Sequence, residues 1–295
     1  MSSLISVIMS TYNRGSILTE AIDSVLNQTY KNIEFIIIND GSTDNTKEIL
    51  SKYSDDRIRL YTNNRNYGCT FNYYMAQNMS QGKYIAHIDD DDIWKSDKLA
   101  IQYEYMERHA NIAMCGTFIE TFGENARPSW VFYTEPKEIE FSMNFYNPIC
   151  HSSVMYRNSF VKELHINYDL SKICAQDFDL YKQIILKGGL ITNIPQVLVR
   201  YRMHKIRLTD IFETQQIQID NAEKIKNELR LRYLDKTDNE IFKYLTEGFP
   251  YNDYNKQNVL NAVKLLDERI KEHNENYISA AVRIKTDIEN GVFKF

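Results

Sequence analysis

An apolar run, Tyr84-Ile85-Ala86-His87-Ile88, leads directly into four consecutive aspartates, Asp89-Asp90-Asp91-Asp92. The apolar run predicts a strand buried in a sheet, and open α/β sheets bind their ligands at the carboxyl ends of such strands. Carboxylates this close repel one another, so they need a cation to stay ionised together, and hard divalent metals prefer oxygen ligands. A solvated acidic turn is the alternative that this run alone leaves open.

The residues before and around this run alternate between strand and helix patterns. Apolar runs predict buried strands, and helical spacing of apolar residues predicts the helices between them. The expected strands are 4–9, 34–38 and 58–61, and the expected helices include 17–26 and 70–79. Another helix is expected to begin at Asp44 or Asn45, with Glu48 completing a capping box. Helical segments of this length between strands imply βαβ units and a largely parallel sheet, hence an α/β fold.

The second half of the chain changes character. Further strands are expected at 112–119, 149–156 and 197–203, with a helix over 177–187 that ends at Gly188-Gly189. From about residue 210 the chain is nearly free of glycine and carries helical spacing, with acids and bases interleaved. Residues 210–295 are therefore predicted to form a helical C-terminal extension.

Composition excludes several classes of protein. The chain has 295 residues and a net charge of −5, which argues against nucleic-acid binding because such proteins carry a basic stripe. Its four cysteines are scattered without CxxC spacing, which is typical of reduced cytoplasmic thiols. Neither a secretory signal nor an apolar stretch of about 20 residues is visible, so a cytoplasmic protein is expected. Peripheral contact with a membrane stays open.

Two other polar loops are expected at the same edge of the sheet as the aspartates. Thr11, Tyr12, Asn13 and Arg14 follow the first strand, and residues 40–44 follow the second. A tyrosine ring offers a face for a planar base, and a carboxylate accepts hydrogen bonds from a base or from ribose hydroxyls. Turn chemistry alone explains either loop, but three polar loops converging on one edge favour a nucleotide site.

Three stretches together resemble the family 2 glycosyltransferases. They are Ser6-Val7-Ile8-Met9-Ser10-Thr11-Tyr12-Asn13, Ile38-Asn39-Asp40-Gly41-Ser42-Thr43-Asp44, and the run from Gly82 to Asp92. The resemblance covers roughly residues 3–205. It implies an inverting enzyme with a GT-A type, Rossmann-like fold for nucleotide-diphospho-sugar transfer. By this resemblance residues 1–209 form the transferase domain, with 1–110 binding the nucleotide and 111–209 the acceptor.

The resemblance also implies a role for each matched residue. Contacts with the sugar nucleotide, expected to be a UDP-sugar, would come from Thr11, Tyr12, Asn13, Arg14, Asp40, Asp89, Asp90 and Arg202. Asp91 would hold Mn²⁺ or Mg²⁺ on the diphosphate, and His204 would complete the metal site. The chain departs from the family at Phe71-Asn72, where many members have an Arg-Asn pair, so Arg65 or Arg14 is expected to substitute for that arginine.

The catalytic base is expected on the acceptor side. The family commonly shows Glu-Asp at the start of a helix, and this chain has Gln176-Asp177, so Asp177 is the matched carboxylate. One base suffices for inversion by direct displacement, because it takes the proton of the attacking acceptor hydroxyl. Asp179 is the alternative base, although it points about 200° around the helix from Asp177. An acid that complements the helix dipole is the structural explanation of Asp177.

The remaining matches concern the leaving group and the acceptor. Tyr201-Arg202-Met203-His204 matches a Tyr-Arg-x-His stretch of the family, where cations would neutralise the departing diphosphate. Trp94 and His151 are assigned to the acceptor pocket. The acceptor would be a glycan or lipid-linked hydroxyl in bacterial surface polysaccharide synthesis, at the inner face of the cell membrane. Residues 210–295 are expected to serve acceptor binding, homo-oligomer contact or docking at a membrane surface, the last being least supported because their mixed charge gives no strong basic amphipathic face.

Two other classes of function remain as alternatives. A non-catalytic module that binds sugar nucleotides or glycans on the same fold would keep the loops and would not depend on Asp177. A nucleotidyltransferase would also use a nucleotide-binding sheet and a metal. It would normally carry a glycine-rich basic loop after the first strand, and residues 11–15 lack one.

Overall fold

The computed structural model describes residues 2–124, 126, 132–204 and 212–230, together with residues 260, 261, 263–265, 268, 283 and 286. The first half contains β1 (Ile5–Thr11), α1 (Leu18–Leu26), β2 (Ile33–Asn39), α2 (Thr46–Leu50), β3 (Ile58–Thr62), α3 (Cys69–Met79), β4 (Tyr84–His87), β5 (Ile93–Trp94) and α4 (Lys98–Arg108). The second half contains β6 (Ile112–Gly123), α5 (Pro136–Ser142), the 3₁₀ helix η1 (His151–Ser153), β7 (Met155–Arg157), α6 (Asn158–Glu163), α7 (Gln176–Leu186), β8 (Leu190–Met203) and α8 (Phe212–Arg230).

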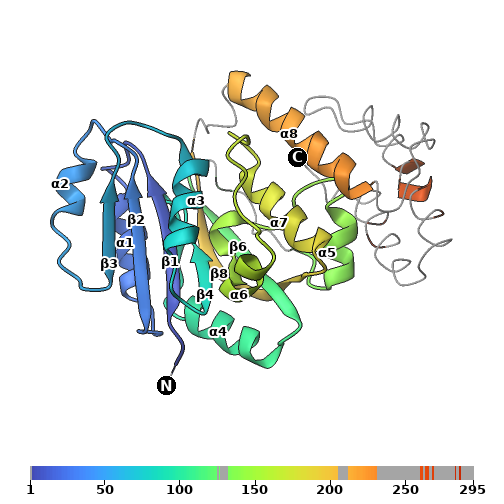
Figure 1. The fold of residues 1–295 in the computed structure, drawn as a ribbon, viewed down its shortest axis with the longest axis horizontal. Coiled ribbons are helices and arrows are strands. Elements are labelled where there is room, and N and C mark those ends of the chain that lie inside the picture. Colours follow the sequence, from blue (N-terminus) through green and yellow to red (C-terminus); the bar gives the residue numbers. More distant parts are fainter. Residues whose placement is uncertain are drawn as a thin grey trace.

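The described strands form one eight-stranded sheet in the order β3-β2-β1-β4-β7-β6-β8-β5. β3, β2, β1 and β4 run parallel to one another, so their carboxyl ends lie at one edge (Figure 1). β7 is antiparallel to both β4 and β6. β5 pairs antiparallel with β8, with Ile93 opposite Arg200, and this pairing joins the loop after β4 to the end of β8.

The strands β1, β2 and β4 are buried on both faces, as their continuous apolar runs predict. Alternate residues of β1 enter two different hydrophobic clusters because side chains of a strand alternate between its faces. Val7 packs in the cluster that contains residues of α1 and α4, whereas Ile8 packs in the cluster that contains residues of α3 and α7. This three-layer α/β arrangement confirms the expected fold class and places every βα loop at the rim of the sheet.

Two local predictions are wrong. The segment expected as a strand over 149–156 is interrupted by the 3₁₀ turn η1, and only its end belongs to the short strand β7. This turn is closed by Ser153, whose hydroxyl donates to the carbonyl of Cys150 at 2.7 Å. The expected capping box at α2 is absent, because Asn45 makes no side-chain cap. Instead the Asp44 carboxylate accepts the backbone N–H groups of Thr46 and of Gly15 in the neighbouring loop.

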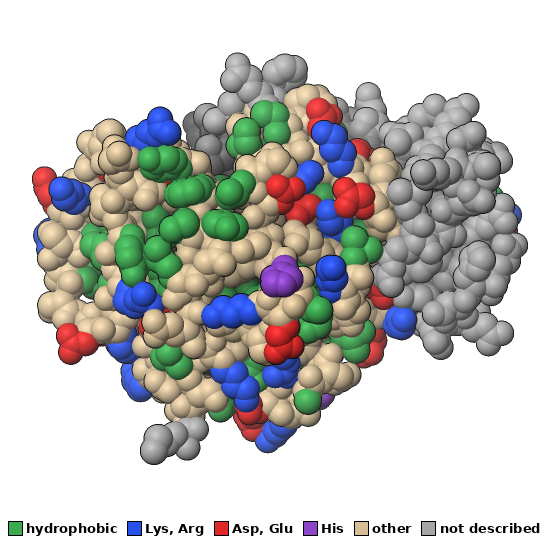
Figure 2. Space-filling view, viewed as in Figure 1, with side chains coloured by type: hydrophobic (Ala, Val, Ile, Leu, Met, Phe, Trp, Pro, Cys, Tyr) green, Lys and Arg blue, Asp and Glu red, His purple; other side chains and the backbone are tan. Residues whose placement is uncertain are grey.

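The described surface mixes charges of both signs. Lys and Arg side chains lie among Asp and Glu side chains over the face shown in Figure 2, as the composition predicts. Within the described residues no helix combines the length and the apolar character needed to span a bilayer. Residues 212–230 form the helix α8, and the predicted boundary of a C-terminal extension remains a prediction. Most of residues 231–295, including the helical spacing noted there, lies outside the described residues.

Candidate active site

The loops after β1 and β2 are tied together by hydrogen bonds. The backbone N–H of Asn13 donates to the Ser42 hydroxyl at 3.0 Å, and the Asn13 side-chain oxygen accepts the N–H of Thr43 at 2.8 Å. Asn13 adopts a left-handed backbone with φ 54°, which asparagine tolerates better than most residues. Tyr12 is 42% exposed beside it, so its ring is open to a ligand. The structure therefore brings these two predicted loops together.

Asp40 lies at the same edge but faces inward. Its Oδ1 accepts the side-chain N–H of Asn63 at 2.8 Å and the backbone N–H of Tyr67 at 3.0 Å. Its Oδ2 accepts the backbone N–H of Gly68 at 2.9 Å. With 2% of its surface exposed, Asp40 holds the loop between β3 and α3 in place. Its predicted contact with the nucleotide remains a prediction.

The four-aspartate loop meets the end of β8. The Asp92 carboxylate, fully buried, accepts the backbone N–H of Arg202 at 2.8 Å. His204 Nε2 lies 2.8 Å from Oδ2 of Asp91, so the predicted metal ligands are adjacent. The Arg202 guanidinium donates to the Asp91 carbonyl at 2.8 Å and to the Glu20 carboxylate at 3.1 Å. A phosphate contact by Arg202 would have to add to or replace these partners.

The carboxyl groups of this loop are not equivalent. Burial and the charge of Asp91 raise the pKa of Asp90 to about 7, against the opposing effects of Arg14 and Thr11. Burial also raises the pKa of Asp92 well above its usual range, and the charge of Asp91 adds to that shift. Arg14 lies 3.5 Å from Asp90 and 3.6 Å from Asp91 and offsets only part of the repulsion. The loop is thus short of positive charge.

Asp89 differs from its neighbours. Burial alone would raise its pKa, but the neighbouring His151 and His87 outweigh burial and hold it below the usual range. His87 Nε2 lies 2.9 Å from Asp89 Oδ1, and the backbone N–H of Asp89 donates to the Ser152 hydroxyl at 3.2 Å. The loop therefore presents one firmly ionised carboxylate next to two that resist ionisation.

The predicted base lies on α7. Asp177 lies in the first turn of α7, and its Oδ2 accepts the side-chain N–H of Asn147 at 2.9 Å. Burial raises the pKa of the Tyr181 phenol, and the charges of both Asp177 and Asp89 raise it further. Ala175, just before the helix, has a left-handed backbone with φ 58°.

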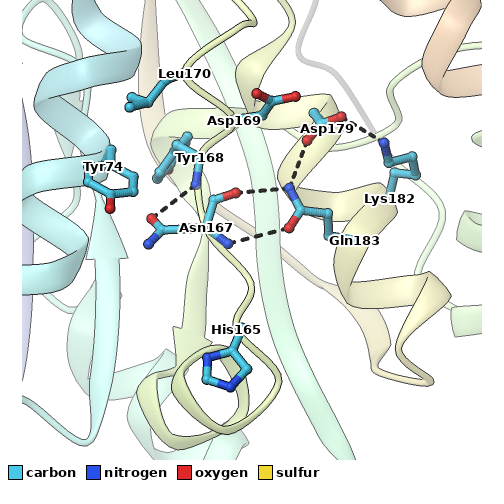
Figure 3. A pocket seen from close by; sticks show the side chains of 9 residues that line it. All are labelled: Tyr74, His165, Asn167, Tyr168, Asp169, Leu170, Asp179, Lys182 and Gln183. Carbon is cyan, nitrogen blue, oxygen red and sulfur yellow. Dashed lines mark hydrogen bonds and ion pairs between the residues drawn. The ribbon is translucent and has the colours of Figure 1, made fainter.

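Asp179 is engaged elsewhere. It lines a pocket of about 490 Å³ between α3, the loop after α6 and α7. In this pocket Asp179 pairs with Lys182 at 2.7 Å and accepts a hydrogen bond from Gln183 at 2.7 Å (Figure 3). Its side chain is 3% exposed, so the structure gives this carboxylate a buried ionic role. The alternative base assignment loses its support here.

The structure contradicts the acceptor role given to Trp94. The ring is 3% exposed, its N–H donates to the carbonyl of Ser152 at 2.8 Å, and the Lys98 ammonium lies 3.8 Å from its centre. Both faces are therefore unavailable to a sugar, and Trp94 instead anchors η1. His151, on the same turn, stacks on His87 with ring centres 3.4 Å apart, which places it against the aspartate loop.

Several residues of the site were not anticipated from the sequence. His87, the last residue of β4, contacts Asp89 two residues later in the chain. This spacing of two residues is the signal that could have indicated the contact. Asn147 and Tyr168 contact Asp177 and His151 from distant segments, and no local pattern points to them. Arg65, considered as a substitute donor arginine, lies over the Tyr67 ring at 4.7 Å.

The residues present fit a divalent cation. Asp91 and His204 offer an oxygen and a nitrogen 2.8 Å apart, a donor set that Mn²⁺ accepts. The buried Oδ2 of Asp92 has no hydrogen-bond partner among the described residues. The raised pKa values of Asp90 and Asp92 show that further positive charge would stabilise the loop. His87, Asp89 and His151 form a second group whose ligand atoms lie within 4.8 Å of one another.

Comparison with known proteins assigns this arrangement to a family. The family described as Glycosyl transferase family 2 matches residues 6–164. The chain is 32% identical over 208 residues to the Escherichia coli "UDP-Glc:alpha-D-GlcNAc-diphosphoundecaprenol beta-1,3-glucosyltransferase WfaP". That match covers 68% of this chain and 78% of the relative.

Two solved structures share the fold. Staphylococcus aureus TarS 1–349 in complex with UDP-GlcNAc gives a TM-score of 0.66 at 17% identity, covering 97% of this chain and 88% of that one. The mannosyltransferase PcManGT of Pyrobaculum calidifontis, in complex with GDP-Man and Mn²⁺, gives a TM-score of 0.60 at 14% identity. That match covers 100% of this chain and 82% of the other. The chain therefore belongs to glycosyl transferase family 2 and is a glycosyltransferase of GT-A fold.

Proposed function

We propose that the protein transfers a sugar from a UDP-sugar to a hydroxyl group of a glycan or lipid-linked acceptor, with inversion at the anomeric carbon. The observation that carries the proposal is the meeting of the aspartate loop with the end of β8, where His204 lies 2.8 Å from Asp91 and Asp92 accepts the backbone N–H of Arg202. These groups are the proposed donor site, and Asp177 in the first turn of α7 is a carboxylate suited to general base chemistry. Bacterial surface polysaccharide synthesis is the proposed setting.

The comparisons support UDP as the nucleotide. The E. coli relative is named for a UDP-glucose donor and an undecaprenol-linked acceptor, and the TarS structure holds UDP-GlcNAc. In this chain Tyr12 is open for stacking beside the Asn13 turn. Arg14, on the same loop, lies within 3.6 Å of Asp91, so one cation already faces the place proposed for the diphosphate.

Asp177 is the proposed general base. In the ground state its Oδ2 accepts from Asn147, which fixes the carboxylate and leaves Oδ1 for the acceptor hydroxyl. As the acceptor oxygen bonds to the anomeric carbon, Asp177 takes the hydroxyl proton, and the bond from that carbon to the diphosphate oxygen breaks. One carboxylate is enough for this single displacement, whereas a double displacement needs a second as nucleophile.

Asp91 and His204 are the proposed ligands of a divalent cation, Mn²⁺ or Mg²⁺. When bound, the cation would neutralise negative charge on the departing diphosphate. The PcManGT structure contains Mn²⁺ with its nucleotide sugar, which supports the same class of ion here. Arg14 remains beside both Asp90 and Asp91 and contributes fixed positive charge to the same loop.

Nucleotide release from a panel of UDP-, GDP- and dTDP-sugars, each with Mn²⁺ and with EDTA, tests the donor assignment. Release of UDP from one donor, dependent on the metal, is expected. Binding of each nucleotide is measured in parallel by calorimetry, because turnover can require an acceptor. Absence of both release and metal-dependent UDP binding would support the non-catalytic alternative, and release from a GDP-sugar alone would replace UDP by GDP.

A further inference from the structure

Asp89 is held by two stacked histidines. His87, fully buried on β4, places Nε2 2.9 Å from Oδ1 of Asp89. His151, on η1, places Nδ1 3.6 Å from the same oxygen. The two imidazole rings stack with centres 3.4 Å apart and planes 21° apart, so each limits the rotation of the other. The Tyr73 hydroxyl approaches the same oxygen at 3.4 Å.

The donors of this cluster all point toward Asp89. Burial, with the neighbouring His151, lowers the pKa of His87 to about 4, so this ring is neutral and donates through Nε2–H. The Tyr168 hydroxyl lies 3.0 Å from His151 Nε2 and is placed to donate to that nitrogen. A histidine that accepts at Nε2 carries its proton on Nδ1, which faces Asp89.

The side-chain contacts of Asp89 are gathered on one of its two oxygens. Across the described residues, every side-chain contact of this carboxylate runs through Oδ1. The side chain is 28% exposed, so solvent or a ligand reaches it. A carboxylate whose Oδ1 receives donors from the protein interior offers Oδ2 as a preorganised acceptor.

We propose that His87 and His151 are positioning residues, which fix Asp89 so that its Oδ2 accepts a hydrogen bond from a hydroxyl group of the sugar nucleotide. The inference rests on the proposed function for the identity of the ligand. The hydroxyl belongs either to the ribose or to the transferred sugar, and the two share the same chemistry toward a carboxylate. Neither histidine touches the ligand; both act through Asp89.

Metal binding by His87, Asp89 and His151 is the competing arrangement for these ligand atoms. Each imidazole binds a metal ion along a nitrogen lone pair in the plane of its ring, at about 2.0–2.1 Å for zinc. His87 Nε2 and Asp89 Oδ1 lie 2.9 Å apart, which is the separation of a direct hydrogen bond. Hydrogen bonding to Asp89 uses the same atoms in the geometry that the structure has.

Substitutions at His87 separate the hydrogen bond from the space that the ring fills. His87→Gln keeps an N–H donor close to the position of Nε2, whereas His87→Phe keeps an aromatic ring and removes the donor. Titration with UDP and with a UDP-sugar in the presence of Mn²⁺ measures the effect. We expect His87→Phe to weaken binding about tenfold or more, the effect of losing a hydrogen bond to a charged group. His87→Gln should retain most of the affinity that His87→Phe loses.

The two ligands identify the hydroxyl. Equal weakening for UDP and the UDP-sugar assigns the contact to ribose, and weakening for the UDP-sugar alone assigns it to the transferred sugar.

His109→Phe is the matched control, because His109 also stacks on an aromatic ring, Tyr105 at 4.1 Å, at the far end of α4. Tyr168→Phe is the second variant should His87→Phe fail to fold, and it should weaken binding by a smaller factor.

Three outcomes overturn the inference. Unchanged binding by His87→Phe and Tyr168→Phe shows that the cluster does not position Asp89. Equal losses in His87→Gln and His87→Phe show that the ring acts by packing alone. Tightly bound metal in the nucleotide-free protein that disappears in His87→Phe favours the metal site. Wild-type protein that binds no sugar nucleotide contradicts the proposed function as well, which distinguishes that failure from the others.

Discussion

At the scale of single residues, the proposed chemistry depends most on Asp177. Asp177→Asn keeps the shape of the side chain and an oxygen that accepts from Asn147, but it removes the proton acceptor. We expect a loss of at least about 10²-fold in kcat, the usual contribution of a positioned base. Affinity for the UDP-sugar, measured by calorimetry, should stay within a factor of about two.

The control for this substitution is Asp56→Asn, which changes an exposed carboxylate away from the site. Activity retained in Asp177→Asn would refute the base assignment and direct attention to another carboxylate. Loss of donor binding together with turnover would place Asp177 in donor recognition instead. Only loss of turnover with intact binding agrees with the proposed mechanism.

The sequence indicated the site residues that follow strands, because parallel strands end at a common edge. Asp91, His204 and Arg14 are close together as predicted, although their roles remain predictions. The orientation of Asp40 and the partners of Asp89 could not be predicted in the same way. Asp40 is turned inward by backbone N–H groups of a loop, and His151 reaches Asp89 from a distant turn. Such contacts depend on tertiary packing.

At the scale of the elements, α4 carries a buried lysine that links stability to pH. Burial lowers the pKa of Lys98 from 10.5 to about 7, against the opposing influence of Cys115 and Cys150. The unfolded chain therefore binds more protons than the folded chain above pH 7, so stability rises with pH. Burial raises the pKa of Cys115 from 9.0 to about 12, which acts in the opposite direction above pH 9.

The window for this effect is consequently pH 7 to 9. Urea unfolding should show wild-type stability gaining about 2 kcal/mol over this window relative to Lys98→Met, which lacks the titrating group. Lys47→Met, at an exposed position of α2, is the control and should follow the wild type. Parallel stability curves for wild type and Lys98→Met would show that Lys98 titrates near its ordinary pKa.

The ion pair between α7 and α8 is a second element-scale feature. Lys182 lies 2.7 Å from Asp179, which is 3% exposed, and 2.7 Å from Glu228, which is 51% exposed. Lys182→Met leaves the Asp179 charge buried without its cation and should cost about 3–5 kcal/mol in urea unfolding. Glu228→Gln breaks only the exposed pair and should cost about 0–1 kcal/mol. Similar losses in the two variants would contradict this division.

A turn glycine positions the loop that Asp40 holds. Gly41 has φ +70°, and a Cβ there would lie 2.6 Å from the backbone of Arg65. Gly188 has φ +82° with nothing within 4 Å of such a Cβ, so it provides a matched control. A left-handed backbone should destabilise both alanine variants by roughly 1–2 kcal/mol. Gly41→Ala should lose more folding stability than Gly188→Ala, because the backbone of Arg65 must shift. Thermal unfolding measures the difference, and equal losses would show that the loop accommodates the methyl group.

The sequence predicted the elements with strong periodicity and missed those set by tertiary contacts. β1, β2 and α3 form where continuous apolar runs or helical spacing indicate them. The segment expected as a strand over 149–156 is broken by η1, which is fixed by hydrogen bonds from Trp94, Gln102 and Thr117. These three residues lie on other elements, so local periodicity contains no signal for the turn.

At the scale of the whole molecule, α8 belongs to the main core. Ile225 and Leu229 are buried in the cluster that also contains residues of β1 and α3. Arg230 is fully buried and donates to the carbonyl of Asn144 at 3.0 and 2.7 Å. The predicted boundary at residue 209 remains a prediction, and these contacts favour unfolding of both parts together.

Calorimetric unfolding of the complete chain tests this coupling. We expect one transition, because removing α8 would expose apolar surface of the cluster it shares with α7 and α3. Leu229→Ala, at a position 1% exposed, should lower the temperature of that whole transition by several degrees, since a large-to-small change in a core costs about 2–5 kcal/mol. Ile217→Ala, on the same helix but 38% exposed, should change it little. Two separate transitions, with Leu229→Ala shifting only one of them, would show that residues 210–295 fold as an independent unit.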